Sequence, residues 1–97
     1  MTTPDEIRVS VLGAGVMGSG IAQVTAIAGY PTVCYDIDAD ALTAGRAHVE
    51  TGRFGVAGAV ERGKLTQAEA DAALARLSFT GSFEEAAAVD VVIEAVP

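Results

Sequence analysis

The sequence has few of the residues that mark several common classes of protein. It contains no tryptophan, one cysteine and six basic residues against 13 acidic ones, so its formal net charge is −7. Non-specific nucleic-acid binding needs a basic face, and this charge balance excludes a broad one. No apolar run approaches the roughly 20 residues that span a bilayer. The opening residues, MTTPDEIRVS, lack the basic and apolar blocks of a signal peptide. We therefore expect neither nucleic acid nor a membrane as a partner.

The cysteine count indicates the cellular location, and the apolar content and length indicate the size of the fold. Cys34 has no second cysteine to pair with, which favours a reducing, cytoplasmic location. Half of the 97 residues (51%) are apolar, although few are aromatic. Alanine, valine, isoleucine and leucine must therefore form the core of one small domain.

Short β-branched segments alternate with helical patterns along the chain. We expect strands over residues 7–13, 32–36, 77–81 and 90–97, and helices over residues 16–28, 39–62, 66–76 and 82–89. This alternation predicts an α/β fold with a parallel sheet, right-handed crossovers and the strand order 3-2-1-4. The fourth strand is mostly apolar, as expected for a strand that is covered on both faces. Residues 1–6 read as a loose, polar start.

Two helices carry recognisable patterns. In the first, Met17, Ile21, Val24 and Ala28 recur at helical spacing and predict its buried stripe, and Gly29 is placed to end it in a left-handed conformation. In the second, Asp38 is a plausible N-cap, but the helix contains three glycines, Gly52, Gly55 and Gly58. Their spacing allows another backbone to approach closely, and a weakened or broken helix is an equal alternative. TQAE at 66–69 and SFEE at 82–85 are predicted capping boxes.

The most informative stretch is VLGAGVMGSGIAQ, which places Gly13, Gly15 and Gly18 between a predicted strand and a predicted helix. This G-x-G-x-x-G spacing in that context is typical of dinucleotide binding. The first glycine permits a tight turn, the second admits a pyrophosphate to the backbone, and the third lets helix and strand pack closely. Free N–H groups at the helix N-terminus then face the phosphates. A glycine turn used only for packing is the alternative.

Asp36 gives a second, independent signal. It ends the second predicted strand, 18 residues after Gly18. A carboxylate at this place accepts hydrogen bonds from the hydroxyls of the adenosine ribose and repels the 2′-phosphate of NADP. We therefore expect NAD as the cofactor. The alternative is that Asp36 only caps the following turn.

Together these residues resemble the NAD-binding domain of the 3-hydroxyacyl-CoA dehydrogenase family. The resemblance covers nearly the whole chain and is carried by GAGVMGSGIAQ, YDID, ERGKLTQAEADAALARL and VDVVIEAVP. A helical pair inserted between the second and third strands, joined by GKLT, is typical of this family. The 3-hydroxyisobutyrate and 6-phosphogluconate dehydrogenases share G-x-G-x-M-G but do not usually carry that pair. The resemblance implies an incomplete Rossmann-type, doubly wound sheet.

The resemblance also assigns candidate contacts. The expected cofactor-binding residues are Gly13, Ala14, Gly15, Val16, Met17, Gly18, Asp36, Ile37, Ala95 and Val96. In some members of the family, a serine and a basic residue seven positions later touch coenzyme A, and these positions align with Gly55 and Arg62. Arg62 is therefore a candidate contact for an acyl-CoA phosphate, with a solvated arginine as the alternative. Glu94 either faces the cofactor crevice or is a structural carboxylate. We expect no metal site.

The same family oxidises a 3-hydroxyacyl-CoA to a 3-oxoacyl-CoA with NAD in fatty-acid metabolism, and short-chain members act on 3-hydroxybutyryl-CoA. Its catalytic histidine, glutamate, serine and asparagine lie after the fourth strand, so no catalytic residue is expected in this chain. His48 does not match the catalytic position and is expected to be a solvated helix residue. Residues 1–97 then correspond to the N-terminal part of an NAD-binding domain without the helical substrate domain, and we expect no turnover by this chain alone.

A second interpretation is a stand-alone nucleotide-binding or assembly module without catalysis. In both interpretations the fourth strand leaves an unpaired apolar edge around Val91 and Ile93, which favours association. We therefore expect a homo-oligomer.

Overall fold

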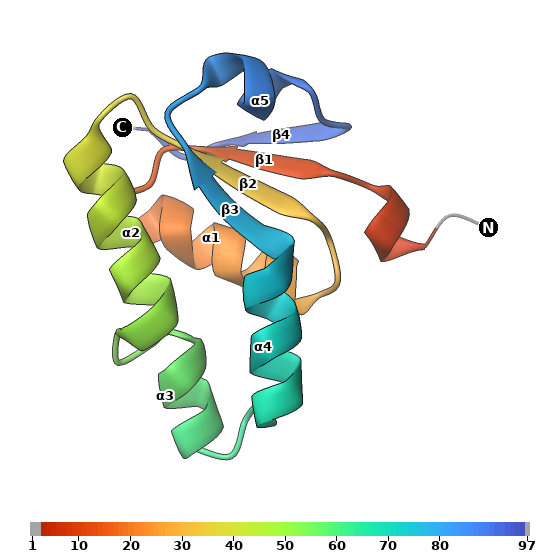
Figure 1. The fold of residues 1–97 in the computed structure, drawn as a ribbon, viewed down its shortest axis with the longest axis vertical. Coiled ribbons are helices and arrows are strands. Elements are labelled where there is room, and N and C mark those ends of the chain that lie inside the picture. The colour runs from red at the N-terminus through yellow and green to blue at the C-terminus, as the bar shows by residue number, and fades with distance from the viewer. Residues whose placement is uncertain (1–2, 97) are drawn as a thin grey trace.

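The computed structural model describes residues 3–96, and a parallel four-stranded sheet forms its centre (Figure 1). The strands are β1 (Val9–Leu12), β2 (Thr32–Tyr35), β3 (Leu77–Thr80) and β4 (Val91–Glu94). Their order is β3-β2-β1-β4, and every neighbouring pair is parallel. The predicted α/β class and strand order are confirmed. Pro97, the last residue of the predicted fourth strand, and residues 1 and 2 of the predicted loose start lie outside the described residues.

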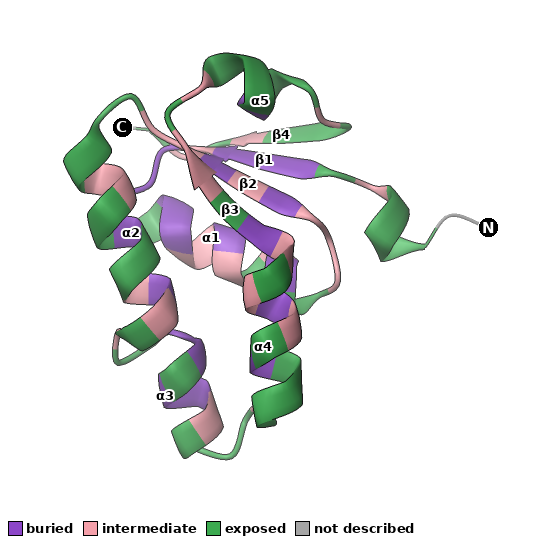
Figure 2. Cartoon of the chain, in the orientation of Figure 1, coloured by how far each residue is buried: buried purple, intermediate pink, exposed green. Residues whose placement is uncertain are grey.

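Helices cover the two faces of the sheet unequally. They are α1 (Val16–Ile27), α2 (Ala39–Thr51), α3 (Val56–Glu61), α4 (Gln67–Arg76) and α5 (Phe83–Ala87), with a 3-10 turn at Pro4–Glu6. Figure 1 shows α1, α2 and α4 on one side of the sheet and α5 on the other, while α3 and the start of α4 extend beyond the sheet. In Figure 2 buried residues lie along β1 and β2, in α1 and in α3. The core lies between the sheet and α1, around Val11 and Cys34, and continues between α2, α3 and α4.

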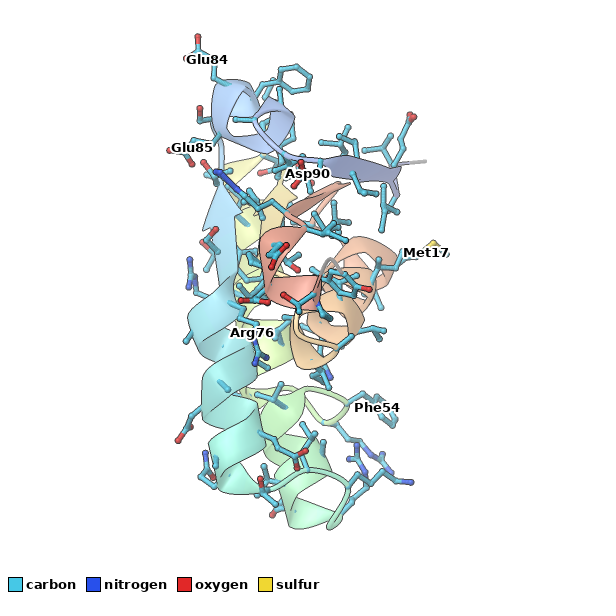
Figure 3. All side chains as sticks on the ribbon, turned by 90° about the vertical axis from the view of Figure 1, so that its right-hand side faces the viewer. Met17, Phe54, Arg76, Glu84, Glu85 and Asp90 are labelled. Carbon is cyan, nitrogen blue, oxygen red and sulfur yellow. The ribbon has the colours of Figure 1, made fainter. Side chains whose placement is uncertain are left out.

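The predicted buried stripe of α1 is wrong. The residues that α1 buries are Gly18, Ser19, Ala22 and Ala26, whereas Met17 is 71% and Val24 is 65% exposed. Only small side chains fit on that face, because α1 lies so close to the glycine turn that a Cβ atom on Gly18 would overlap the carbonyl oxygen of Gly13. Met17 and Val24 consequently face outward, and Figure 3 shows Met17 projecting away from the body of the protein, whereas Ile21 of the predicted stripe is half-buried against the core.

The helix expected over residues 39–62 is broken, as its alternative prediction stated. Residues 52–55 separate α2 from α3. A Cβ atom on Gly52 or on Gly55 would collide with the carbonyl oxygen of His48. The glycines therefore admit a close backbone approach, but the approaching backbone is the last turn of α2 itself. The chain therefore turns sharply between α2 and α3, and this turn lets α3 pack against α4.

The remaining helix ends follow the predicted chemistry with one exception. Asp38 caps α2 by accepting from the N–H of Asp40, and Thr66 and Glu69 form a reciprocal capping box at α4. Gly29 follows α1 with a φ of +110°, in the left-handed region as predicted. At α5 the predicted box is only half formed. Ser82 accepts from the N–H of Glu85, but the N–H of Ser82 donates to the Thr80 hydroxyl instead.

The prediction that β4 is covered on both faces is also wrong. Val91 is 44% and Val92 is 52% exposed. The strand pairs with β1 on one side, and within residues 3–96 no strand pairs with its other side. The apolar character of β4 therefore creates an exposed edge rather than a buried strand.

Candidate dinucleotide-binding site

A cleft of about 640 Å³ opens at the carboxyl ends of β1, β2 and β4. This is where ligands of open α/β sheets bind, beside the point at which the strand order reverses. The cleft is lined by Gly13, Gly15, Val16, Met17, Gly18, Asp36, Ala41, Glu94, Ala95 and Val96. Eight of the ten predicted cofactor residues therefore meet at one place, although they come from three separate segments of the sequence.

Two of the three glycines shape the turn between β1 and α1. Gly13 has a φ of +109°, and a Cβ atom on it would lie 3.1 Å from both the carbonyl oxygen of Ala95 and Cγ1 of Val96. A Cβ atom on Gly18 would overlap the carbonyl oxygen of Gly13. The first glycine thus permits the turn beside the end of β4, and the third brings α1 against that turn. Both roles match the expectation from the spacing.

Gly15 has a different environment. It is the N-cap of α1, makes no side-chain cap, and a Cβ atom on it would have no neighbour within 4 Å. The space in front of Gly15 is therefore open cleft. Since the first N–H groups of a helix lack intrahelical partners and carry partial positive charge, this opening suits a phosphate group. A side chain at this position would fill the space that such a group needs.

The Asp36 carboxylate is fixed beside this turn. Its Oδ2 accepts from the N–H of Ala14 at 2.9 Å, and its Oδ1 accepts from the N–H of Asp38 at 2.9 Å. These backbone donors, that of Ala14 first, lower the pKa of Asp36 below its ordinary value, against a smaller opposing effect of burial. Asp36 is thus an oriented anion at the edge of the cleft, as a contact to ribose hydroxyls requires. It also takes part in the turn, as the alternative prediction stated.

The other predicted cofactor residues occupy two kinds of position. Val16 is 78% exposed and borders the cleft, together with Met17. Ile37 is 87% exposed and lies next to Asp36 in sequence, although it does not line the cleft. Ala14 is only 1% exposed and lies behind the turn, where its N–H supports Asp36.

Two residues at the cleft need separate comment. Ala41, in the first turn of α2, lines the cleft, and the sequence prediction missed it because an alanine near a helix start carries no local signal. Glu94 also borders the cleft. Because it pairs with Leu12 and alternates with the core-facing Ile93, its side chain lies on the α5 side of the sheet.

Arg62 and His48 do not reach this cleft. Arg62 is the C-cap of α3, and its Nη1 donates to the carbonyl oxygen of Arg53 at 2.8 Å. The guanidinium groups of Arg53 and Arg62 lie 5.4 Å and 5.9 Å from the ring centre of Phe54, which is 66% exposed. His48 is half-buried rather than fully solvated. It borders a hollow between α2 and the start of α1.

Residues 3–96 contain no group of three or more His, Cys, Asp or Glu side chains arranged to hold a metal ion. Among the same residues, no helix has both the length and the apolar content needed to cross a membrane.

Comparison with known families gives a match over almost the whole chain. Residues 8–97 match the family described as 3-hydroxyacyl-CoA dehydrogenase, NAD binding domain. This range contains the glycine turn, Asp36, the helical pair and β4.

Individual relatives agree with this match. A probable 3-hydroxybutyryl-CoA dehydrogenase of Bacillus subtilis is 39% identical over 89 residues, which are 92% of this chain and 30% of the relative. A fatty acid oxidation complex subunit alpha of Acinetobacter baylyi is 42% identical over 92% of this chain and 12% of its own length. The crystal structure of (S)-3-hydroxybutyryl-CoA dehydrogenase from Ralstonia eutropha superimposes with a TM-score of 0.84 at 39% identity, over 94% of this chain and 31% of that one. The chain thus spans less than a third of the length of these proteins.

Proposed function

The chain belongs to the 3-hydroxyacyl-CoA dehydrogenase NAD-binding domain family, and from this premise we propose that it forms the cofactor-binding part of an NAD-dependent dehydrogenase. The proposed reaction of the parent protein is oxidation of a 3-hydroxyacyl-CoA to a 3-oxoacyl-CoA in fatty-acid metabolism. Short-chain substrates of the 3-hydroxybutyryl-CoA kind are favoured by the relatives from Bacillus subtilis and Ralstonia eutropha.

One observation carries the proposal. The open space in front of Gly15 and the oriented carboxylate of Asp36 lie in the same cleft, joined through the turn residue Ala14. Gly15 and the N-terminus of α1 bind the pyrophosphate, while Asp36 accepts hydrogen bonds from the adenosine ribose and repels a 2′-phosphate. Ile37 lies beside the adenosine, and Val16 and Met17 provide apolar surface at the phosphates.

This arrangement orients the rest of the cofactor. With Asp36 holding the adenosine and Gly15 the pyrophosphate, Ala95 and Val96 at the end of β4 would hold the nicotinamide end. NAD supplies a hydride acceptor when bound. The proposed oxidation would also need a base to take the proton of the substrate's 3-hydroxyl group. The single histidine, His48, lies on the α2 side of the turn and not at the end of β4, so it is not assigned to that base.

We further propose that residues 1–97 correspond to the N-terminal part of the cofactor domain, and that a helical substrate domain supplies the catalytic residues. The chain alone is then inactive. An assay of acetoacetyl-CoA reduction by NADH tests this, because turnover above background contradicts it. The alternative, a nucleotide-binding or assembly module without a catalytic parent, predicts the same inactivity. Restored turnover when the chain is fused to the substrate domain of a relative separates the two.

Calorimetric titration with NADH, with NADPH as the control, tests cofactor binding directly. The arrangement of Asp36 and Gly15 predicts that NADH binds and that NADPH binds more weakly. Equal binding of both contradicts the role of Asp36. Binding of neither contradicts the proposal that this chain holds an assembled cofactor site.

We propose Arg62 as a contact for the phosphates of acyl-CoA. Its support is the exposed cluster of Arg53, Phe54 and Arg62, which gathers two cations and an aromatic ring in a chain of net charge −7. Figure 3 shows Phe54 projecting on the same side as Met17 of the cofactor cleft. Because Arg62 also braces the loop before α3, Arg62→Lys serves as a control that keeps the charge. In a chain that includes the substrate domain, unchanged acyl-CoA affinity of Arg62→Ala contradicts this contact.

Two features of the setting complete the proposal. The exposed edge of β4 favours association into a homo-oligomer, since an unpaired strand offers its N–H and C=O groups to a partner. A single buried cysteine, Cys34, with no partner for a disulfide favours the cytoplasm.

A further inference from the structure

Gly45, in the middle of α2, lies directly behind the turn that carries the cofactor glycines. It is buried, and a Cβ atom on it would lie only 2.7 Å from the carbonyl oxygen of Ala14 and 3.4 Å from Cβ of Ala14. Cε1 of Phe79, on β3, is also 3.4 Å from that position. Gly45 is therefore enclosed between the turn and the sheet. Any side chain there must push α2 away from the turn or displace the turn itself.

The atom that Gly45 faces belongs to a functional peptide group. The carbonyl of Ala14 and the N–H of Gly15 form one planar unit, in which the two groups point in opposite directions. A force on the Ala14 oxygen therefore rotates the N–H of Gly15, which is the N-cap of α1 at the proposed phosphate position. Ala14 is 1% exposed, so it has little room to absorb such a shift in another way.

Ala14 also positions the carboxylate of Asp36. The N–H of Ala14 donates to Oδ2 of Asp36, so the two polar groups of Ala14 face different elements. Its oxygen faces α2, and its nitrogen fixes the carboxylate proposed for the ribose. Beside the contact, a hollow of about 140 Å³, bordered by Ala44 and His48, lies between α2 and Gly15. Helix α2 thus supports the turn at Ala14 and leaves Gly15 clear.

We infer that Gly45 is a positioning residue for the dinucleotide site, setting the orientation of the Ala14–Gly15 peptide and of Asp36 by allowing α2 to rest on the turn. The inference rests on the proposed function for its ligand, but not for its geometry. Gly45 lies outside the G-x-G-x-x-G spacing, 31 positions after Ala14, and touches no part of the cleft itself.

The test compares Gly45→Ala with Gly20→Ala in the full 97-residue chain. Both replacements add one methyl group inside a helix, but a Cβ atom on Gly20 meets nothing within 4 Å. The first readout needs no cofactor: NMR titration of the Asp36 carboxyl, together with the amide shift of Gly15. We expect Gly45→Ala to raise the pKa of Asp36 toward its ordinary value and to move the Gly15 amide, whereas Gly20→Ala leaves both unchanged.

The second readout is the dissociation constant for NADH and for NADPH. We expect Gly45→Ala to weaken NADH binding about tenfold, equivalent to about 1.4 kcal/mol, and to narrow the preference for NADH. A merely structural role would lower the melting temperature and leave the Asp36 pKa, the Gly15 amide and the ratio of affinities as they are. That result in a folded variant overturns the inference.

Two further outcomes are distinguishable. If the unmodified chain binds neither cofactor, the proposal that this chain holds an assembled cofactor site fails, while the pKa and amide readouts still decide the role of Gly45. If Gly45→Ala does not fold, Val49→Ala loosens the next turn of α2 without adding an atom, since Val49 is 1% exposed in the core. An Asp36 pKa that rises in this variant supports the inference, and one that stays low overturns it.

Discussion

The N–H of Ala14 donates to Oδ2 of Asp36 at 2.9 Å, across 22 positions of sequence, and so joins the glycine turn to the end of β2. This bond links the two halves of the proposed cofactor site, the phosphate position and the ribose position. Because the Asp38 N–H holds the other oxygen, the carboxylate is oriented before any ligand arrives. Such preorganisation reduces the entropy that binding must offset.

Replacing Asp36 with alanine removes both the ribose acceptor and the charge that repels a 2′-phosphate. We expect Asp36→Ala to weaken NADH binding about tenfold, since hydrogen bonds to a charged group contribute about 1.5–3 kcal/mol. NADPH binding should weaken less or improve. Titration calorimetry with both cofactors measures this. An unchanged preference for NADH shows that Asp36 only shapes the turn.

The lowered pKa of Asp36 also predicts how stability depends on pH. A carboxyl whose pKa is lower in the folded than in the unfolded chain stabilises the fold above its ordinary pKa of 3.8, and this contribution disappears as the pH falls through the folded value. The free energy of unfolding should therefore exceed that of Asp36→Asn by a constant amount above about pH 5. The difference should shrink below pH 4. Urea unfolding at several pH values measures this difference. Glu69→Gln should show the same kind of pH dependence, because the N–H of Thr66 lowers the pKa of Glu69 as well.

Two alanine replacements in the glycine turn separate binding from folding. Gly15→Ala adds a methyl group that meets no protein atom, so we expect its melting temperature to fall little while NADH binding is lost. Gly18→Ala places its methyl group on the carbonyl of Gly13 and should lower the free energy of unfolding by about 2 kcal/mol or more. Thermal unfolding and titration calorimetry check the pair. If the two variants behave alike, the distinction between the open and the packed glycine is wrong.

The capping box of α4 gives a prediction about stability alone. Thr66 accepts from the N–H of Glu69, and the Glu69 carboxylate accepts from the N–H of Thr66. Thr66→Ala should cost about 1 kcal/mol, as is usual for a lost N-cap, because the first turn of α4 then lacks that acceptor. Thr66→Ser keeps the hydroxyl and should retain most of the stability. Because α4 lies outside the cofactor cleft, NADH affinity should not change, and a change would show that α4 influences the site.

The sequence predicts the features of this fold that depend on local chemistry. The cap at Asp38, the box at Thr66 and the left-handed Gly29 follow from residue types and short spacings, and the strand order follows from the alternation of strands and helices along the chain. The buried face of α1 does not, because hydrophobic periodicity selects Met17 and Val24 whereas the close approach of helix and sheet admits only small side chains. The contact of Gly45 with Ala14 is likewise invisible, since no local pattern joins residues that meet only after α2 folds back on the turn.

The exposed edge of β4 predicts association of the chain. Val91 and Val92 are 44% and 52% exposed beside unpaired N–H and C=O groups, and such edges pair readily with other strands. Sedimentation velocity should show a mass above the 9.8 kDa of one chain that rises with concentration. Val92→Lys should restore the monomer, because a charged side chain on an edge strand opposes pairing. The control is Ser78→Lys, which adds the same charge to β3 at the opposite edge, where Ser78 is exposed. Loss of association in this variant instead would place the contact at β3, and a monomer at all concentrations would contradict association itself.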